Sequence, residues 1–109
     1  MCNIKIQAVT MGLLLGGSVM SGYTMAADGA ALYKEKTCIA CHGPEGREPV
    51  MNSYPKLAGQ NEQYLVSQMQ IIKSGVRNNS HTAAMKNIMH LVSAEEMTTI
   101  AKWLSGLKK

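Results

Sequence analysis

The chain has 109 residues, a length that accommodates one domain. Its 11 Lys and Arg residues outnumber its 7 Asp and Glu residues and give a formal net charge of +4, with no basic run interleaved with aromatic residues. This small excess of positive charge excludes a typical nucleic-acid-binding protein. The chain has three cysteines, one of which is Cys2, and this number does not form a disulfide framework.

Residues 1–27 have the features of an export signal. A single lysine, Lys5, precedes the apolar run 8–15, and small residues follow up to Ala27. The run is too short to span a bilayer and is broken by a pair of glycines. We therefore predict a secretory leader that is cleaved next to Ala27, leaving residues 28–109 as a single domain without a stable membrane anchor.

The first helix of this domain is expected over residues 28–36. Asp28 is a good N-cap, and the residues after it favour helix and run directly into the next motif. Gly29 and Tyr33 are spaced i and i+4, so they lie on one face and leave a notch beside an aromatic ring. A notch of this kind lets a second helix approach closely.

The segment Cys38-Ile39-Ala40-Cys41-His42 has the spacing that attaches haem covalently to a polypeptide. In one helical turn, Cys38, Cys41 and His42 project from the same face. The two thiols can then add to the two vinyl groups of one porphyrin edge, while the imidazole reaches the iron. The motif predicts one haem c, covalently bound through Cys38 and Cys41, with His42 as an iron ligand.

Three other interpretations use the same residues. A redox-active dithiol normally lies in a βαβ context, and no alternating strand pattern flanks the motif. A zinc site that adds His81 or His90 to the motif lacks the usual second ligand pair at short spacing. A disulfide between Cys38 and Cys41 would close a very small loop and add little stability.

Residues 43–55 are predicted to form a loop. This segment contains all three prolines of the chain as well as two glycines, at positions 43 and 46. It is long for a loop, and a haem beneath it would give Val50, Met51 and Tyr54 a flat surface to cover.

A middle helix is expected over residues 61–74. Asn61 is a suitable N-cap, an apolar stripe recurs at the spacing i, i+4, i+7, and Gly75 ends the helix. The stripe consists of Leu65, Met69 and Ile72. Residues 77–87 are expected to form a polar, turn-rich loop with room for a short turn at its end.

The last helix has signals at both ends. Ser93 and Glu96 form a capping box, and Gly106 is a stop signal. The apolar stripe between them consists of Met97, Ile100, Ala101 and Leu104, with Trp103 beside it. Helices joined by irregular loops, without a strand candidate, predict an all-α domain.

Taken together, these motifs resemble the class I c-type cytochromes, in particular the small bacterial monohaem domains that are also found duplicated in dihaem cytochromes. The resemblance covers residues 28–109. It is carried by Cys38-Ile39-Ala40-Cys41-His42-Gly43, Pro55-Lys56-Leu57-Ala58-Gly59-Gln60 followed by Tyr64-Leu65, Gly75-Val76-Arg77, and the final helix from Val92 to Leu104.

The resemblance implies a class I cytochrome c fold in which the first and last helices cross, with Gly29 and Tyr33 meeting Trp103, and the middle helix and loops surround the haem. It also implies that the carbonyl of Pro55 accepts a hydrogen bond from the imidazole of His42.

Three further residues, Gln60, Tyr64 and Arg77, are similar in place to family residues that hold the haem propionates. For Arg77, a solvated loop cation is an equally simple interpretation.

The family's distal iron ligand is a methionine in the loop before the last helix. Its usual spacing places an apolar residue three and seven positions after the ligand, which Ile88 and Val92 satisfy for Met85. The resemblance therefore implies Met85 as the second metal ligand. Met89, which also suits a core position, remains an alternative, as does a histidine, His81 or His90, of which His81 is favoured because it lies in the open loop.

The function implied is one-electron transfer in the periplasm by a low-spin haem with His and Met ligands, without enzymatic activity. Its partners would be periplasmic redox proteins, and the modest positive charge suits docking to an acidic patch. We expect a monomer or weak dimer. The alternatives are a haem subunit of a larger periplasmic oxidoreductase and a haem sensor or haem enzyme with a labile sixth ligand.

Overall fold

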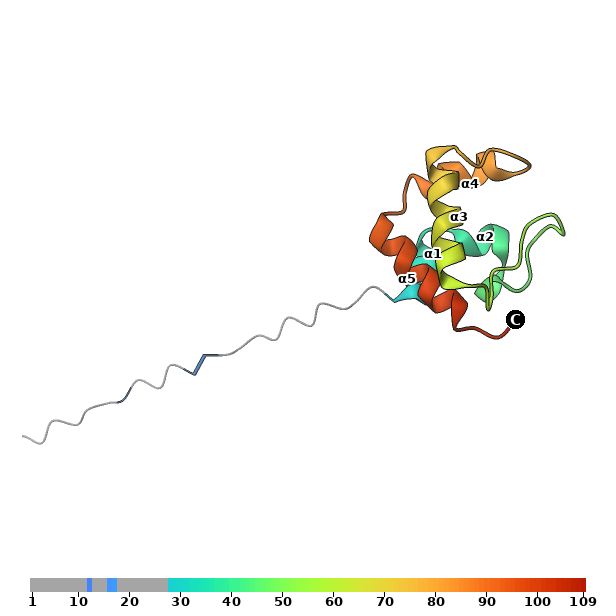
Figure 1. Ribbon diagram of the computed structural model, residues 1–109. Coiled ribbons are helices and arrows are strands. Elements are labelled where there is room, and N and C mark those ends of the chain that lie inside the picture. The colour runs from blue at the N-terminus through green and yellow to red at the C-terminus, as the bar shows by residue number, and fades with distance from the viewer. Residues whose placement is uncertain (1–11, 13–15, 18–27) are drawn as a thin grey trace, which may run out of the picture.

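The structure is a computed structural model that describes residues 12, 16–17 and 28–109. The predicted leader and its cleavage point lie almost wholly outside the described residues. Within these residues every regular element is helical, as expected for an all-α domain (Figure 1). The elements in chain order are α1 (Gly29–Glu35), α2 (Cys38–His42), a 3₁₀ turn η1 (Pro44–Gly46), α3 (Glu62–Ser74), α4 (Thr82–Met89) and α5 (Ala94–Ser105).

The first and last helices pack closely together at the predicted glycine notch. A Cβ atom placed on Gly29 would lie 2.4 Å from the Cβ of Trp103 and 2.8 Å from the carbonyl oxygen of Thr99. The ring of Tyr33 lies 5.2 Å from the ring of Trp103, measured between centroids. The expected contact of Gly29 and Tyr33 with Trp103 is therefore confirmed, and it depends on the missing side chain at position 29.

The caps predicted for the two longest helices are present. The Asn61 side chain accepts a hydrogen bond from the backbone N–H of Tyr64 at 2.9 Å. At the start of α5, Ser93 and Glu96 form the reciprocal capping box, with distances of 2.9 and 3.1 Å. The two predicted stripes are buried and form the centre of the core; they consist of Leu65, Met69 and Ile72 in α3 and Met97, Ile100, Ala101 and Leu104 in α5.

The loop predicted over residues 77–87 is only partly correct, because α4 is a helix that begins at Thr82. The helix has no side-chain hydrogen bond from its N-cap residue, His81, so the sequence carries no start signal. Instead, Thr82 closes the turn that precedes the helix, since its hydroxyl donates to the carbonyl oxygen of Asn79 at 2.7 Å. At the other end Met89 is only 1% exposed, so burial anchors a helix that propensity alone does not indicate.

Candidate haem-binding site

A cavity of about 380 Å³ opens between α2, the segment after it, α3 and α4. This volume falls in the range of pockets that hold small molecules, roughly 300–1,000 Å³. All residues that the sequence assigns to the site contribute to its lining: Cys38, Cys41, His42, Pro55, Gln60, Tyr64, Arg77 and Met85. The fold thus brings together side chains that are spread over much of the domain.

The short helix α2 places both thiols and the imidazole along one wall of this cavity. Cys38 is half-buried and Cys41 is exposed, and the two cysteines do not form a disulfide with each other. Thr37, directly before the motif, has a positive φ of 63°. A β-branched residue rarely adopts this conformation, and here it lets the chain turn from α1 into α2.

His42 is held in a defined orientation. Its side chain is buried, and its Nδ1 lies 3.0 Å from the carbonyl oxygen of Pro55, as the resemblance implies. Because a carbonyl only accepts, Nδ1 must donate, which leaves the Nε2 lone pair free toward the cavity. Burial lowers the pKa of His42, opposed by the hydrogen bond to Pro55. The imidazole is therefore neutral near pH 7, which is the form that binds a metal.

The segment that carries Pro55 is fixed by backbone hydrogen bonds. The carbonyl oxygen of Gly46 accepts from the N–H of Leu57 at 2.8 Å, and the N–H of Gly59 donates to the carbonyl oxygen of Leu104 at 2.9 Å. Arg47 adds a hydrogen bond of 2.8 Å from its Nε to the carbonyl oxygen of Lys108. The residues directly after Pro55 are thus attached to η1 and to the end of α5, which restricts the position of the Pro55 carbonyl.

Of the candidate distal ligands, Met85, Met89 and His81 line the cavity. Met85 is partly buried, whereas Met89 is 1% exposed and belongs to the hydrophobic core. His81 is exposed, and its ring lies 5.2 Å from the ring of Tyr54 in an edge-on arrangement. His90 is exposed and is not among the residues that line the cavity.

The polar residues at the cavity include one that sequence reasoning missed. Gln68 accepts a hydrogen bond from Nη1 of Arg77 through its Oε1 at 2.9 Å, so the guanidinium is oriented toward the cavity lining. The signal for Gln68 was its spacing of i+4 from Tyr64, which places both residues on one face of α3. Tyr64 is half exposed at the same cavity.

Two of the alternative interpretations of the motif find no support in this geometry. In the described residues no group of three or more His, Cys, Asp or Glu side chains could hold a metal ion, as a zinc site would need. Burial also raises the pKa of the Cys38 thiol to about 11. A redox-active dithiol requires the opposite, a thiol whose pKa is lowered.

The donor set fits a haem. The cavity combines two thiols and a neutral, oriented imidazole on one wall with thioethers and apolar side chains on α3 and α4. A porphyrin is a flat apolar group that needs this combination of covalent anchors, nitrogen or sulfur ligands and an apolar enclosure. Among the described residues, no helix is long and apolar enough to cross a membrane.

Comparisons with known proteins identify relatives across most of the chain. Cytochrome c4 of Azotobacter vinelandii is 34% identical over 108 residues, which cover 92% of this chain and 50% of that protein. A protein of Thiomonas intermedia named thiosulfate dehydrogenase electron acceptor is 40% identical over 79 residues, covering 72% of this chain and 35% of that protein. Cytochrome c-553 of Nitratidesulfovibrio vulgaris is 36% identical over 104 residues, covering 95% of this chain and 96% of that protein. The chain thus spans half or less of the length of the first two relatives and nearly the whole of the third.

The family model for cytochrome c matches residues 26–108. This range includes the whole cavity and the packed pair of helices α1 and α5. The chain therefore belongs to the cytochrome c family of electron carriers and carries haem c covalently attached through Cys38 and Cys41 of the motif that ends at His42.

Proposed function

We propose that this cytochrome c is a periplasmic one-electron carrier whose haem iron is bound by His42 and Met85, and that residues 1–27 are the leader that exports it. The observation that carries this proposal is that one cavity is lined by both residues. The buried His42 imidazole lies there with its Nδ1 hydrogen-bonded to the Pro55 carbonyl, and the partly buried thioether of Met85 lines the same cavity.

When bound, the haem supplies a one-electron iron couple, and a Met/His ligand pair raises its reduction potential. The chain's own residues set the conditions of that couple. Pro55 fixes the tautomer and direction of the His42 ring, which raises the basicity of the ligand nitrogen. If His42 and Met85 both bind the iron, they would leave no free coordination site for a substrate.

Gln60, Tyr64 and Arg77 are proposed to hold the haem propionates. All three line the cavity, and Arg77 is oriented by its hydrogen bond to Gln68. A guanidinium held in this way presents its remaining N–H groups to a carboxylate in a fixed direction. The positive charge of the Arg77 guanidinium also offsets part of the free-energy cost of burying an anionic group near the iron.

Electrons would enter and leave at the side of the cavity where Cys41 is exposed. The carbonyl of Cys41 accepts a hydrogen bond from the N–H of Val50 at 3.1 Å, so the loop lies against the motif there. Val50 is 64% exposed and Met51 is 43% exposed, which gives this edge an apolar surface for a partner.

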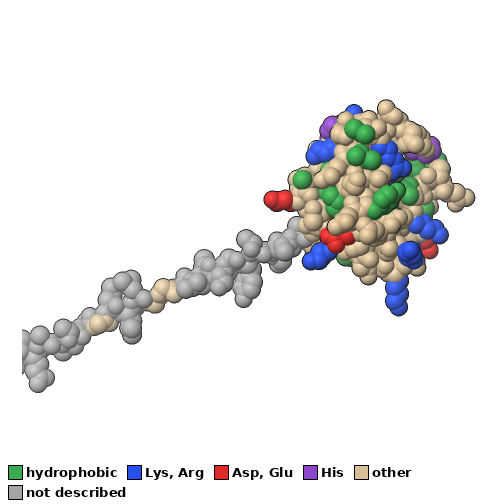
Figure 2. Space-filling model, in the orientation of Figure 1, with side chains coloured by type: hydrophobic (Ala, Val, Ile, Leu, Met, Phe, Trp, Pro, Cys, Tyr) green, Lys and Arg blue, Asp and Glu red, His purple; other side chains and the backbone are tan. Residues whose placement is uncertain are grey.

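On the face of the molecule shown in Figure 2, Lys and Arg side chains are dispersed and do not gather in one patch. The partners proposed are periplasmic redox proteins, encountered transiently by a monomer or weak dimer. Because two relatives are named thiosulfate dehydrogenase electron acceptor, an enzyme of that class is the first electron donor to test.

The test of the ligand pair is a spectrum of the oxidised protein in the near-infrared, where iron bonded to a thioether gives a weak band. Met85→Leu removes the sulfur with little change in volume and should abolish the band, whereas the matched change Met89→Leu should retain it. His81→Ala should leave the visible spectrum unchanged. A band that survives Met85→Leu and disappears in Met89→Leu would move the ligand to Met89.

Carbon monoxide distinguishes the carrier from a haem sensor or haem enzyme. A reduced protein with both axial positions filled by His42 and Met85 should not bind carbon monoxide at neutral pH. Binding by the unmodified protein at neutral pH would contradict the carrier proposal and favour a labile sixth ligand. The Met85→Leu variant, which has lost one ligand, is the positive control for this measurement.

A further inference from the structure

Two lysines, Lys73 in α3 and Lys86 in α4, link the C-terminal part of α3 to α4 and to the segment that follows it. Lys73, in the last turn of α3, is half-buried and donates from Nζ to the carbonyl oxygen of Val92 at 2.6 Å. Lys86 lies in the last turn of α4. Its Nζ is 2.9 Å from the position that a Cβ would occupy if Gly75, the C-cap of α3, carried a side chain. Since helix C-termini carry partial negative charge, the position of the Lys86 ammonium at the end of α3 is favourable.

Val92 is the point at which α4 can be held in place. Its N–H donates to the carbonyl oxygen of Met89 at 3.1 Å, and the N–H of Leu91 donates to that of Ile88 at 2.9 Å, so residues 91 and 92 close the end of α4. The Val92 side chain is 1% exposed. A hydrogen bond to the Val92 carbonyl therefore acts directly on the end of α4.

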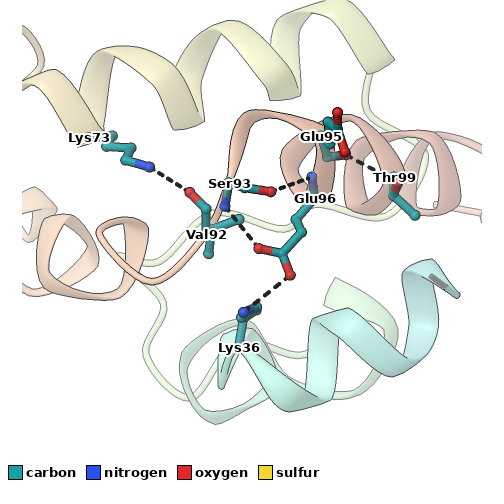
Figure 3. A network of polar contacts seen from close by, with 7 residues as sticks. All are labelled: Lys36, Lys73, Val92, Ser93, Glu95, Glu96 and Thr99. Atoms are coloured by element: carbon teal, nitrogen blue, oxygen red, sulfur yellow. Dashed lines mark hydrogen bonds and ion pairs between the residues drawn. The ribbon is translucent and has the colours of Figure 1, made fainter.

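The segment at Val92 is also attached to α1, as Figure 3 shows. The next residue, Ser93, begins the capping box of α5, and the carboxylate of Glu96 also pairs with Lys36 at 3.1 Å, at the end of α1. The segment between α4 and α5 is thus fixed to α1 through Glu96 and to α3 through Lys73. Of these two attachments, Lys73 is the one that contacts the residue closing α4.

We propose that Lys73 is a positioning residue that fixes α4, and with it Met85, against α3; this inference rests on the proposed ligation by Met85. Helix α4 has only 8 residues and no side-chain hydrogen bond from its N-cap, so it is too short to be stable by itself. Its position depends on attachments at its two ends. Met85 lies one turn before Met89 on this helix, so movement of the end of α4 moves the thioether.

The experiment compares Lys73→Met with a matched control, Lys102→Met. Both variants lose one positive charge, but Lys102 is exposed on α5 and its ammonium makes no hydrogen bond or ion pair in the part of the chain that the structure describes. The first measurement is displacement of the methionine ligand by added imidazole. It is monitored as loss of the near-infrared band of the oxidised holoprotein. The second is hydrogen exchange of the α4 amides, which does not depend on which residue binds the iron.

Lys73→Met should bind imidazole and exchange the α4 amides roughly tenfold more readily than the unmodified protein, since a hydrogen bond from a charged donor is lost. Lys102→Met should behave as the unmodified protein. Lys73→Arg should also behave nearly as the unmodified protein, because the arginine side chain can still donate a hydrogen bond to the Val92 carbonyl oxygen. Equal imidazole affinity and α4 exchange in Lys73→Met would overturn the proposal. If the unmodified protein has no near-infrared band, ligation by Met85 fails, and the α4 exchange then decides the role of Lys73 alone.

Discussion

Replacing Gly29 by alanine tests the contact between α1 and α5 directly. The added Cβ would lie 2.4 Å from the Cβ of Trp103 and 2.8 Å from the Thr99 carbonyl oxygen, and neither atom is the end of a flexible side chain. Overpacking of this kind costs about 1–3 kcal/mol. The better helix propensity of alanine offsets about 0.5–1 kcal/mol of that cost. We expect a net loss of about 1–2 kcal/mol in the free energy of unfolding, or a fall in Tm of roughly 5–15 °C for a domain of this size.

The assay is unfolding of the holoprotein in guanidinium chloride, monitored through the fluorescence of Trp103. Trp103 is the single tryptophan of the chain, and it packs on Tyr33 in the folded state, so its emission should change on unfolding. Gly106→Ala is the matched control, because a Cβ there would meet nothing closer than 3.6 Å. Its stability should change by no more than about 0.5 kcal/mol. Equal stability of the Gly29 and Gly106 variants would refute the reasoning that α1 and α5 meet at Gly29.

Three further predictions concern the haem motif and the start of α5. Thr37→Asn should raise the free energy of unfolding by about 1 kcal/mol, measured by the same assay, because Asn tolerates the positive φ of 63° better than a β-branched residue. The hydrogen bond from the Ser93 N–H and the Lys36 ammonium hold the pKa of Glu96 below its ordinary value of 4.5. The stability from this group is complete above about pH 4.5 and is lost as the pH falls through the lower folded pKa. In a Tm titration from pH 7 to pH 3, Glu96→Gln should therefore be less stable than the unmodified protein at pH 7, and the two should converge at acid pH; a constant difference would contradict this origin. Cys38→Ser should leave one thioether and shift the reduced pyridine haemochrome band, whereas an unchanged band would show that Cys38 is not attached to haem.

The parts of the fold that follow from short-range rules could be predicted from the sequence. Asn61 and the Ser93 capping box mark helix starts, and their partners lie three residues away in the chain. The Cys-x-x-Cys-His spacing identifies one wall of the cavity in the same local way. Helix α4 does not follow from such rules, because the turn before it is closed by the Thr82 hydroxyl and its N-cap makes no side-chain hydrogen bond.

The remaining features depend on partners that are distant in the chain. Arg47 bonds a carbonyl 61 residues later, and Lys73 bonds one 19 residues later. Both acceptors are backbone oxygens, so the identity of the accepting residue carries no signal that a sequence pattern could reveal. The hydrogen bond between Arg77 and Gln68 also requires the turn after α3 to fold back first.

The backbone contacts that hold the Pro55 carbonyl have a consequence for the speed of the reaction. A dipole that is free to turn must reorient whenever the charge of the iron changes, and that rearrangement forms part of the activation barrier. The Pro55 carbonyl is hydrogen-bonded to His42, and the residues directly after it, Leu57 and Gly59, are bonded to Gly46 and Leu104 before any electron arrives. Polar groups fixed in advance require little reorganisation, so this carrier should exchange electrons rapidly even with partners of nearly equal potential.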